Sequence, residues 1–126
     1  MPQIILEKSS NIKSLSENKE VFTNIHRVLH ELGKINLENC KSRARIANDY
    51  LVGDGNLGEA FVHLEIRFLE GRSEELKSKL GGEILAILER NFLIAGNPSK
   101  LQITVEISDI IKSSYFKFPA GAFSEQ

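Results

Sequence analysis

Several residue types and patterns are scarce in this sequence, and each scarcity excludes a class of protein. The 126 residues include one cysteine, Cys40, so no disulfide can form within the chain. No apolar run approaches the roughly 18 residues that a membrane-spanning helix needs. The N-terminus lacks the basic head and the long apolar stretch of a signal peptide. We therefore expect a cytoplasmic protein without a membrane partner.

An excess of charge of one sign is also lacking. The 16 Lys and Arg residues nearly balance the 17 Asp and Glu residues, and the formal net charge is −1. A dedicated nucleic-acid binder usually carries a basic excess, so we do not expect nucleic acid as a partner. Any anionic ligand must be held by a few local cations. The length, with 41% hydrophobic and 26% charged residues, predicts a single folded domain over residues 1–126.

Hydrophobic periodicity predicts four strands and two helices. The expected strands are 3–6, 39–52, 60–68 and 101–107. The first helix is expected to follow a capping box formed by Ser14 and Glu17 and to stop at Gly33. The second helix is expected to begin after Ser73, which is a suitable N-cap residue, and to be ended by Gly96-Asn97-Pro98.

These elements follow one another as two β-α-β halves, and this order predicts the fold class. Right-handed crossovers make each half a parallel strand pair with a helix on one face. We expect an α+β fold in which two β-α-β units form one mixed sheet with two helices on one face. From the pattern alone, a ferredoxin-like two-layer sandwich is the natural model. The glycines at 81–82 predict a close approach of the second helix to the sheet.

Three features look like binding motifs but have simpler explanations. The loop 53–58 has the spacing G-x-G-x-x-G, but a strand follows it instead of a helix, so we expect a hairpin turn and no dinucleotide site. His26 and His30 lack an obvious third metal ligand and are expected to lie on a solvated helix face. Cys40 has no predicted activating partner and is expected to be a small core residue. We predict no metal site and no cofactor.

Pro2 is the residue with the greatest catalytic potential. Removal of Met1 would leave a chain that begins with a secondary amine. An α-amino group in water has a pKa of about 8. Burial and nearby cations both disfavour the protonated amine and lower this pKa toward neutrality. A free base at neutral pH can abstract a proton from a substrate. The alternative is that translation and processing alone explain the Met-Pro start.

The order of several short motifs resembles the tautomerase superfamily, and more closely the 5-carboxymethyl-2-hydroxymuconate isomerase family. The matching segments are Pro2 with 4–7, Ser42-Arg43, Asp54-Gly55, 60–63, Gly71-Arg72-Ser73 and Phe116-Lys117. The correspondence extends over nearly the whole chain. The resemblance implies a homotrimer with its sheets inside, its helices outside and its active sites at subunit boundaries.

The resemblance also implies roles for individual residues. Pro2 would be the catalytic base and acid, and Arg72 would bind a substrate carboxylate. Arg72 also lies just before a helix N-terminus, which favours anions. Lys41 stands where the family has a second arginine, so the charge is kept but the planar fork is lost. Arg43 matches a neighbouring family arginine, and Phe116 is expected to form a wall of the pocket.

The implied reaction moves a proton by a 1,3- or 1,5-shift in an unsaturated 2-hydroxy or 2-oxo di- or tricarboxylic acid. One alternative is another proline-base enzyme, such as a hydratase or dehalogenase. A second alternative is a non-enzymatic trimeric binding or regulatory module. The cations also have a structural alternative, because Lys41, Arg43 and Arg45 share one strand face and can pair with Glu65 and Glu106 across strands or subunits. We favour that explanation for Arg45.

Overall fold

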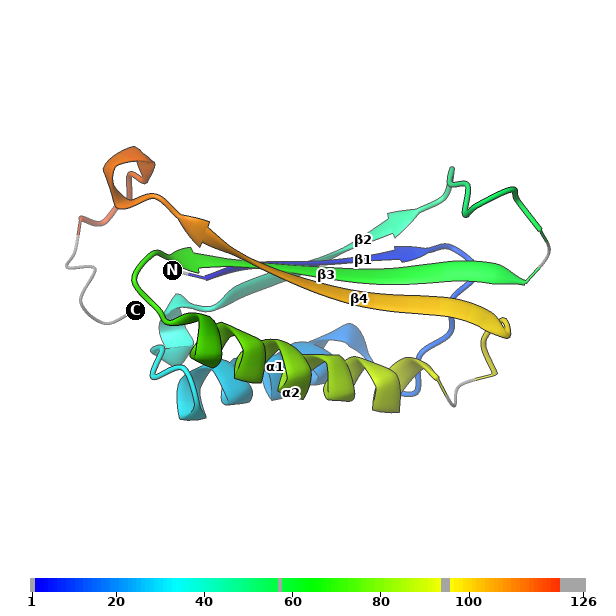
Figure 1. The fold of residues 1–126 in the computed structure, drawn as a ribbon, viewed down its shortest axis with the longest axis horizontal. Helices are drawn as coiled ribbons and strands as arrows, with labels where there is room; N and C mark the ends of the chain where they lie inside the picture. Colours follow the sequence, from blue (N-terminus) through cyan, green and yellow to red (C-terminus); the bar gives the residue numbers. More distant parts are fainter. Residues whose placement is uncertain (1, 57, 94–95, 121–126) are drawn as a thin grey trace.

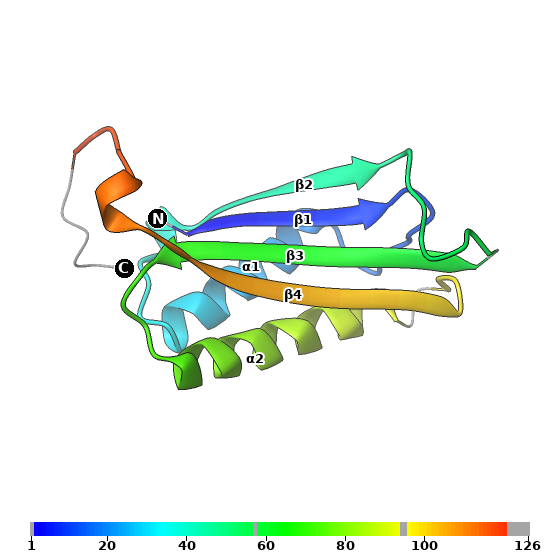
Figure 2. The same ribbon diagram turned by 45° about the horizontal axis from the view of Figure 1, so that its top comes forward.

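The computed structural model describes residues 2–56, 58–93 and 96–120 and contains one four-stranded sheet with two long helices (Figure 1). The strands are β1 (Gln3–Ser9), β2 (Lys41–Ala47), β3 (Glu59–Leu69) and β4 (Lys100–Ile110). The helices are α1 (Asn18–Glu31) and α2 (Glu74–Phe92), with short 3₁₀ helices η1 (Leu37–Asn39) and η2 (Lys112–Ser114). Both long helices lie against one face of the sheet, and neither covers the other face (Figures 1 and 2).

The strand order is β2-β1-β3-β4, with both β-α-β pairs parallel and the central β1–β3 pair antiparallel. This arrangement confirms the expected α+β class, with one mixed sheet and both helices on one face. The ferredoxin-like model was wrong in its topology, because that fold splits each β-α-β unit with another strand. Here the two strands of each unit are direct neighbours.

The core lies between the sheet and the two helices. Alternate residues of each central strand face the helices, as a half-buried strand requires. The strand residues at the centre of this core are Ile4, Leu6, Val62, Leu64, Ile66 and Phe68. The helix residues that pack against them are Val21, Ile25, Leu29, Leu80, Ile84, Leu88 and Phe92.

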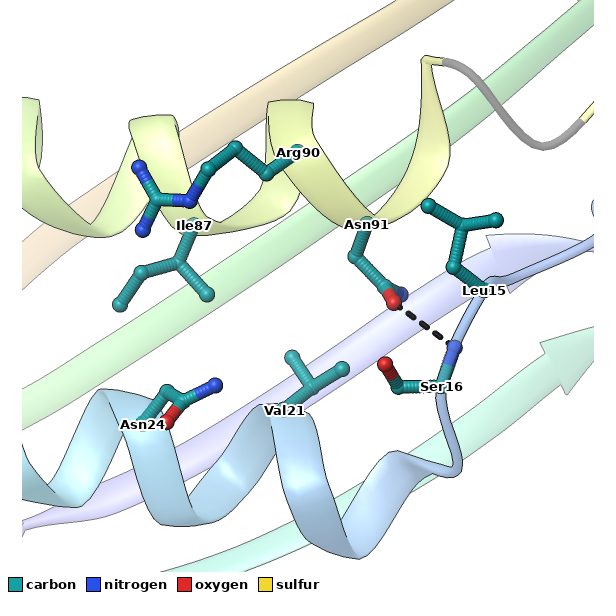
Figure 3. A pocket seen from close by; sticks show the side chains of 7 residues that line it. All are labelled: Leu15, Ser16, Val21, Asn24, Ile87, Arg90 and Asn91. Atoms are coloured by element: carbon teal, nitrogen blue, oxygen red, sulfur yellow. Dashed lines mark hydrogen bonds between the residues drawn. The ribbon is translucent and has the colours of Figure 1, made fainter.

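The start of α1 differs from the expected capping box. The helix begins at Asn18, and the side chain of Glu17 at the N-cap position makes no capping hydrogen bond. The preceding segment is held by the end of α2 instead (Figure 3). The backbone N–H of Leu15 donates to the Asn91 carbonyl at 3.1 Å, and that of Ser16 donates to Asn91 Oδ1 at 3.0 Å. A small cavity of about 110 Å³ lies beside these contacts.

Gly33, which follows the last turn of α1, lies where a larger residue would not fit. A Cβ atom on Gly33 would lie 2.6 Å from the carbonyl oxygen of Leu29, which is a clash. The left-handed backbone conformation that ends the helix belongs to Lys34, with φ of 56°. Gly33 therefore ends the helix as expected, but through close packing against the preceding turn.

The glycine pair in α2 behaves differently. A Cβ on Gly81 would lie 3.6 Å from Ile107 Cδ1, an ordinary contact with β4, whereas a Cβ on Gly82 would meet nothing within 4 Å. The expected approach to the sheet thus holds for Gly81 alone.

The glycine-rich loop 53–58 is not a hairpin turn. It joins β2 to β3, and β1 lies between these two strands in the sheet. The next element along the chain is the strand β3, so the motif lacks the helix that a dinucleotide site needs. β2 is also shorter than the expected strand, because η1 precedes it and it ends at Ala47.

Candidate functional site

Pro2 lies at one end of the sheet, where several chain segments meet. The first residues of β1 and β2 and the last residues of β3 and β4 are gathered at this end (Figures 1 and 2). Pro2 is buried, and the backbone N–H of Lys41 donates to its carbonyl oxygen at 3.2 Å. This hydrogen bond continues the β1–β2 ladder by one residue and fixes the position of Pro2.

The register of the sheet identifies the neighbours of Pro2. Gln3 pairs with Lys41 on one side and with Arg67 on the other. Continuing both ladders by one residue places Pro2 between Cys40 and Phe68. Pro2 is therefore flanked by Cys40, just before β2, on one side and by the end of β3 on the other.

Arg72 reaches the same end of the sheet through Phe68. Its guanidinium carbon lies 4.7 Å from the centroid of the Phe68 ring, in cation–π geometry. Its Nη1 atom donates to the carbonyl oxygen of Leu69 at 3.2 Å. The turn after β3 thus holds the half-buried Arg72 side chain against the β3 residue that adjoins Pro2.

The charge of Arg72 is not neutralised by an ion pair. Burial lowers the pKa of the guanidinium from its ordinary value, and the attraction of Asp109 partly opposes this shift. Asp109 is itself paired with Lys77, with 2.9 Å between Oδ1 and Nζ. Within residues 2–56, 58–93 and 96–120, no carboxylate forms an ion pair with Arg72. An arginine remains charged under these conditions, so its remaining N–H donors can bind an anion.

Lys41 and Arg43 extend from the other flank of Pro2. Both are exposed residues of the edge strand β2, and Lys41 also borders the cleft between β2 and α1. Lys41 Nζ donates to the Asn39 carbonyl at 3.3 Å, and Arg43 Nη1 donates to Gln3 Oε1. Gln3 Nε2 in turn donates to the Tyr115 hydroxyl at 3.2 Å. The pattern of charges did not identify Gln3, because its link to Arg43 depends on the register of two strands.

The expected structural pairing of the β2 cations takes a different form within the chain. Arg45 lies opposite Glu7, because β1 separates β2 from β3. Glu106 instead contacts His63, with 3.3 Å between Oε1 and Nε2. His63 Nδ1 lies 2.6 Å from Thr104 Oγ1. Polar contacts therefore do form on the face of the sheet that the helices leave uncovered. They join His63 to Glu106 and Thr104, which the sequence did not predict.

The aromatic residues after β4 show two kinds of environment. Tyr115 packs against Leu69 and Ile110, whereas Phe116 is 88% exposed and Phe118 is 96% exposed. Phe116 can therefore form a wall of a pocket only if another subunit covers it. Phe123, another aromatic residue of this C-terminal segment, lies outside the described residues.

Both histidines of α1 contact protein groups, and His30 is nevertheless exposed, as expected for a solvated helix face. His26 Nε2 lies 2.7 Å from Ser42 Oγ, and His30 Nδ1 lies 2.8 Å from the Ile35 carbonyl. His26 is half-buried, and burial lowers its pKa from 6.5. In the described ranges, no group of three potential metal ligands is found. Cys40 packs against the edge of the core as expected, and burial raises the pKa of its thiol.

Comparison with known proteins decides the family. The model of the family described as 5-carboxymethyl-2-hydroxymuconate isomerase matches residues 2–120. The chain belongs to this family. Its members are isomerases, and the chain is accordingly an enzyme of the isomerase class within the tautomerase superfamily. This membership confirms the resemblance inferred from the ordered motifs.

Individual relatives agree with this assignment. The 5-carboxymethyl-2-hydroxymuconate Delta-isomerase of Escherichia coli is 25% identical over 117 residues, which are 93% of each chain. The crystal structure of a 5-carboxymethyl-2-hydroxymuconate isomerase from Deinococcus radiodurans R1 has a TM-score of 0.78 and 27% identity, covering 92% of this chain and 87% of that one. The Q0 fused 4-OT wild-type symmetric trimer has the same fold, with a TM-score of 0.71, 14% identity and coverage of 98% and 97%.

The arrangement around Pro2 combines predicted and unpredicted residues. Pro2 and Arg72 were predicted, and they lie at the same end of the sheet. Phe68, which connects them, carried no sequence signal beyond its place in an apolar strand pattern.

In the part of the chain that the structure describes, neither helix has the length and apolar character needed to span a bilayer.

Proposed function

We propose that this isomerase moves a proton within an unsaturated 2-hydroxy or 2-oxo di- or tricarboxylic acid, with the nitrogen of Pro2 as the base. Removal of Met1 would expose this nitrogen as a secondary amine. The main supporting observation is the burial of Pro2 beside Phe68 and Arg72. Burial disfavours the protonated amine, and the nearby cation acts in the same direction. Both effects favour a free base at neutral pH.

The proposed reaction conserves all atoms and needs no cofactor. The Pro2 nitrogen takes the proton from the 2-hydroxyl group of a dienol, and a dienolate forms. The protonated Pro2 then returns this proton to a carbon of the conjugated chain, which gives the 2-oxo isomer. Negative charge develops on the substrate oxygen in between, and a nearby guanidinium stabilises it.

Arg72, Lys41 and Arg43 are proposed to bind substrate carboxylates. Arg72 is the strongest candidate, because it is half-buried and has no carboxylate partner among the described residues. The backbone of Lys41 is hydrogen-bonded to Pro2, but the ammonium group of Lys41 lacks the two-pronged geometry of a guanidinium. Arg43 is partly occupied by Gln3. Phe116 would contribute only from a neighbouring subunit.

We also propose that the chain assembles as a homotrimer. β2 and β4 are edge strands of the four-stranded sheet, and exposed edges tend to be paired or covered. Neither described helix covers the opposite face of the sheet (Figures 1 and 2). The solved Q0 fused 4-OT relative is a symmetric trimer, which supports the same arrangement here. The working location is proposed to be the cytoplasm, since a lone cysteine suits a reducing compartment.

Kinetics of a Pro2→Ala variant test the proposal. The substrate is 2-hydroxymuconate, whose ketonisation is followed by the loss of dienol absorbance. General base catalysis typically contributes about 10² to 10⁴ in rate, so we expect kcat to fall at least about 100-fold. An unchanged rate would exclude Pro2 as the base. Formation of a hydrated product, or release of halide from a halogenated acid, would favour the hydratase or dehalogenase alternative.

A further inference from the structure

A cleft of about 510 Å³ lies between α1 and the start of β2. α1 contributes Lys19, Phe22 and His26 to its lining, and the chain at the start of β2 contributes Cys40, Lys41 and Ser42. Small-molecule sites usually have volumes of about 300 to 1,000 Å³. The cleft is therefore large enough for a short organic acid.

The lining of this cleft is positively charged. It contains two lysines and no acidic residue. Lys41 Nζ donates to the backbone carbonyl of Asn39, and within the described ranges no carboxylate forms an ion pair with Lys19 or Lys41. Uncompensated charge of one sign in a concave surface attracts ligands of the opposite sign. The cleft thus favours an anion.

The Ser42 hydroxyl, which lines the same cleft, is held by a histidine of α1. His26 Nε2 lies 2.7 Å from Ser42 Oγ. Because burial lowers the pKa of His26 below its usual 6.5, the imidazole is neutral at pH 7 and carries a single ring hydrogen. With this hydrogen on Nε2, the imidazole donates to Ser42, and the Ser42 hydroxyl can then donate to a ligand.

The cleft begins next to Pro2. Continuing the register of β1 and β2 places Pro2 opposite Cys40, which lines the cleft. Neighbouring strands lie about 4.8 Å apart, so the cleft starts about one strand spacing from Pro2. Arg72 lies on the opposite flank, beyond Phe68. A substrate that spans Pro2 would have one end near Arg72 and the other end in the cleft.

We propose that the α1–β2 cleft binds a second carboxylate of the substrate, with Lys19 supplying positive charge and Ser42 supplying a hydrogen bond. This assignment rests on the proposed function, because it takes Pro2 as the reacting group. It makes Lys19 and Ser42 specificity residues that select di- or tricarboxylates over monocarboxylates.

The test compares two dienol substrates that differ in their number of carboxylates. 2-Hydroxymuconate carries two, and 2-hydroxypenta-2,4-dienoate carries one. For a Lys19→Met, Ser42→Ala double variant, we expect the KM of the dicarboxylate to rise about tenfold, which corresponds to the loss of a charge-assisted contact. The KM of the monocarboxylate and both kcat values should stay within about twofold. Lys79→Met, which removes an exposed cation from α2, is the matched control and should change neither KM.

Two results would overturn the assignment. One is an unchanged KM for the dicarboxylate, and the other is an equal rise in KM for both substrates. If Ser42→Ala does not fold, the exposed Lys19→Met substitution alone decides. Failure of the underlying chemistry would look different, because Pro2→Ala would then retain its rate whatever the KM values of the cleft variants.

Discussion

The guanidinium of Arg72 lies over the ring of Phe68, 4.7 Å from its centroid, at the point where β3 ends beside Pro2. This contact holds the charge of Arg72, which forms no ion pair within the described residues, at the end of the sheet where the proposed base lies. An Arg72→Met substitution would keep apolar contact with Phe68 but lose the charge. We expect kcat/KM for 2-hydroxymuconate to fall about 100-fold, equivalent to about 3 kcal/mol. Steady-state kinetics measure this effect.

Arg72→Lys serves as the control for that prediction. Lysine keeps the charge but not the fork, so its kcat/KM should lie between those of the wild type and Arg72→Met. The free energy of unfolding of both variants should stay within about 1 kcal/mol of the wild type. Full kcat/KM in Arg72→Met would show that Arg72 does not bind substrate.

Replacing Gly82 within α2 and replacing Gly33 just after α1 should have opposite effects on stability. Gly82→Ala should raise the free energy of unfolding by about 1 kcal/mol, because its Cβ meets nothing within 4 Å and alanine has the higher helix propensity. Gly33→Ala should lower it by about 2 kcal/mol, because its Cβ would lie 2.6 Å from the Leu29 carbonyl oxygen. Urea denaturation measures both values. Equal effects of the two substitutions would contradict this packing.

Lys8 is a buried cation without a carboxylate partner among the described residues. It is 8% exposed, its Nζ lies 3.4 Å from Asn18 Oδ1 and 5.5 Å from the Phe92 ring centroid, and burial lowers its pKa from 10.5. Lys8→Met should therefore raise the free energy of unfolding at pH 7 by about 1 kcal/mol.

The pH dependence of the same comparison provides a check. Between the lowered native pKa of Lys8 and 10.5, the unfolded chain binds more protons than the folded chain, so wild-type stability rises with pH. The advantage of Lys8→Met should shrink as pH rises through this window. A variant less stable than the wild type at pH 7 would mean that the ammonium contacts outweigh the cost of burial.

His26 predicts a loss of stability in mild acid. Its native pKa lies below 6.5 because the ring is half-buried, so the unfolded chain binds the additional proton first. The free energy of unfolding should therefore fall as pH drops below about 6.5 toward the native pKa. Urea denaturation between pH 5 and 8 should show a weaker dependence for His26→Gln. The same pH dependence in both proteins would remove His26 as its source.

Local pattern was enough to predict the elements but not their arrangement. The alternation at 60–68 predicted β3 because every second residue is apolar. The strand order was not predictable, because nothing local indicates that β1 lies between β2 and β3. The capping box failed for a similar reason, since Asn91 holds Leu15 and Ser16 from a distant part of the chain.

The candidate site shows the same division. Pro2 and Arg72 were found through ordered motifs, which are properties of the sequence. The Phe68 contact, the link from Gln3 to Arg43 and the pairing of His26 with Ser42 all join residues on different elements. Each depends on register or helix packing, so no single segment of sequence carries a signal for it.

The most direct test of the proposed mechanism is the intact mass of the active protein. Pro2 can act as a base only when its nitrogen is an amine, because an amide nitrogen is not basic. The protein that ketonises 2-hydroxymuconate should therefore be one methionine residue lighter than the 126-residue chain. Full activity in protein that retains Met1 would contradict the mechanism.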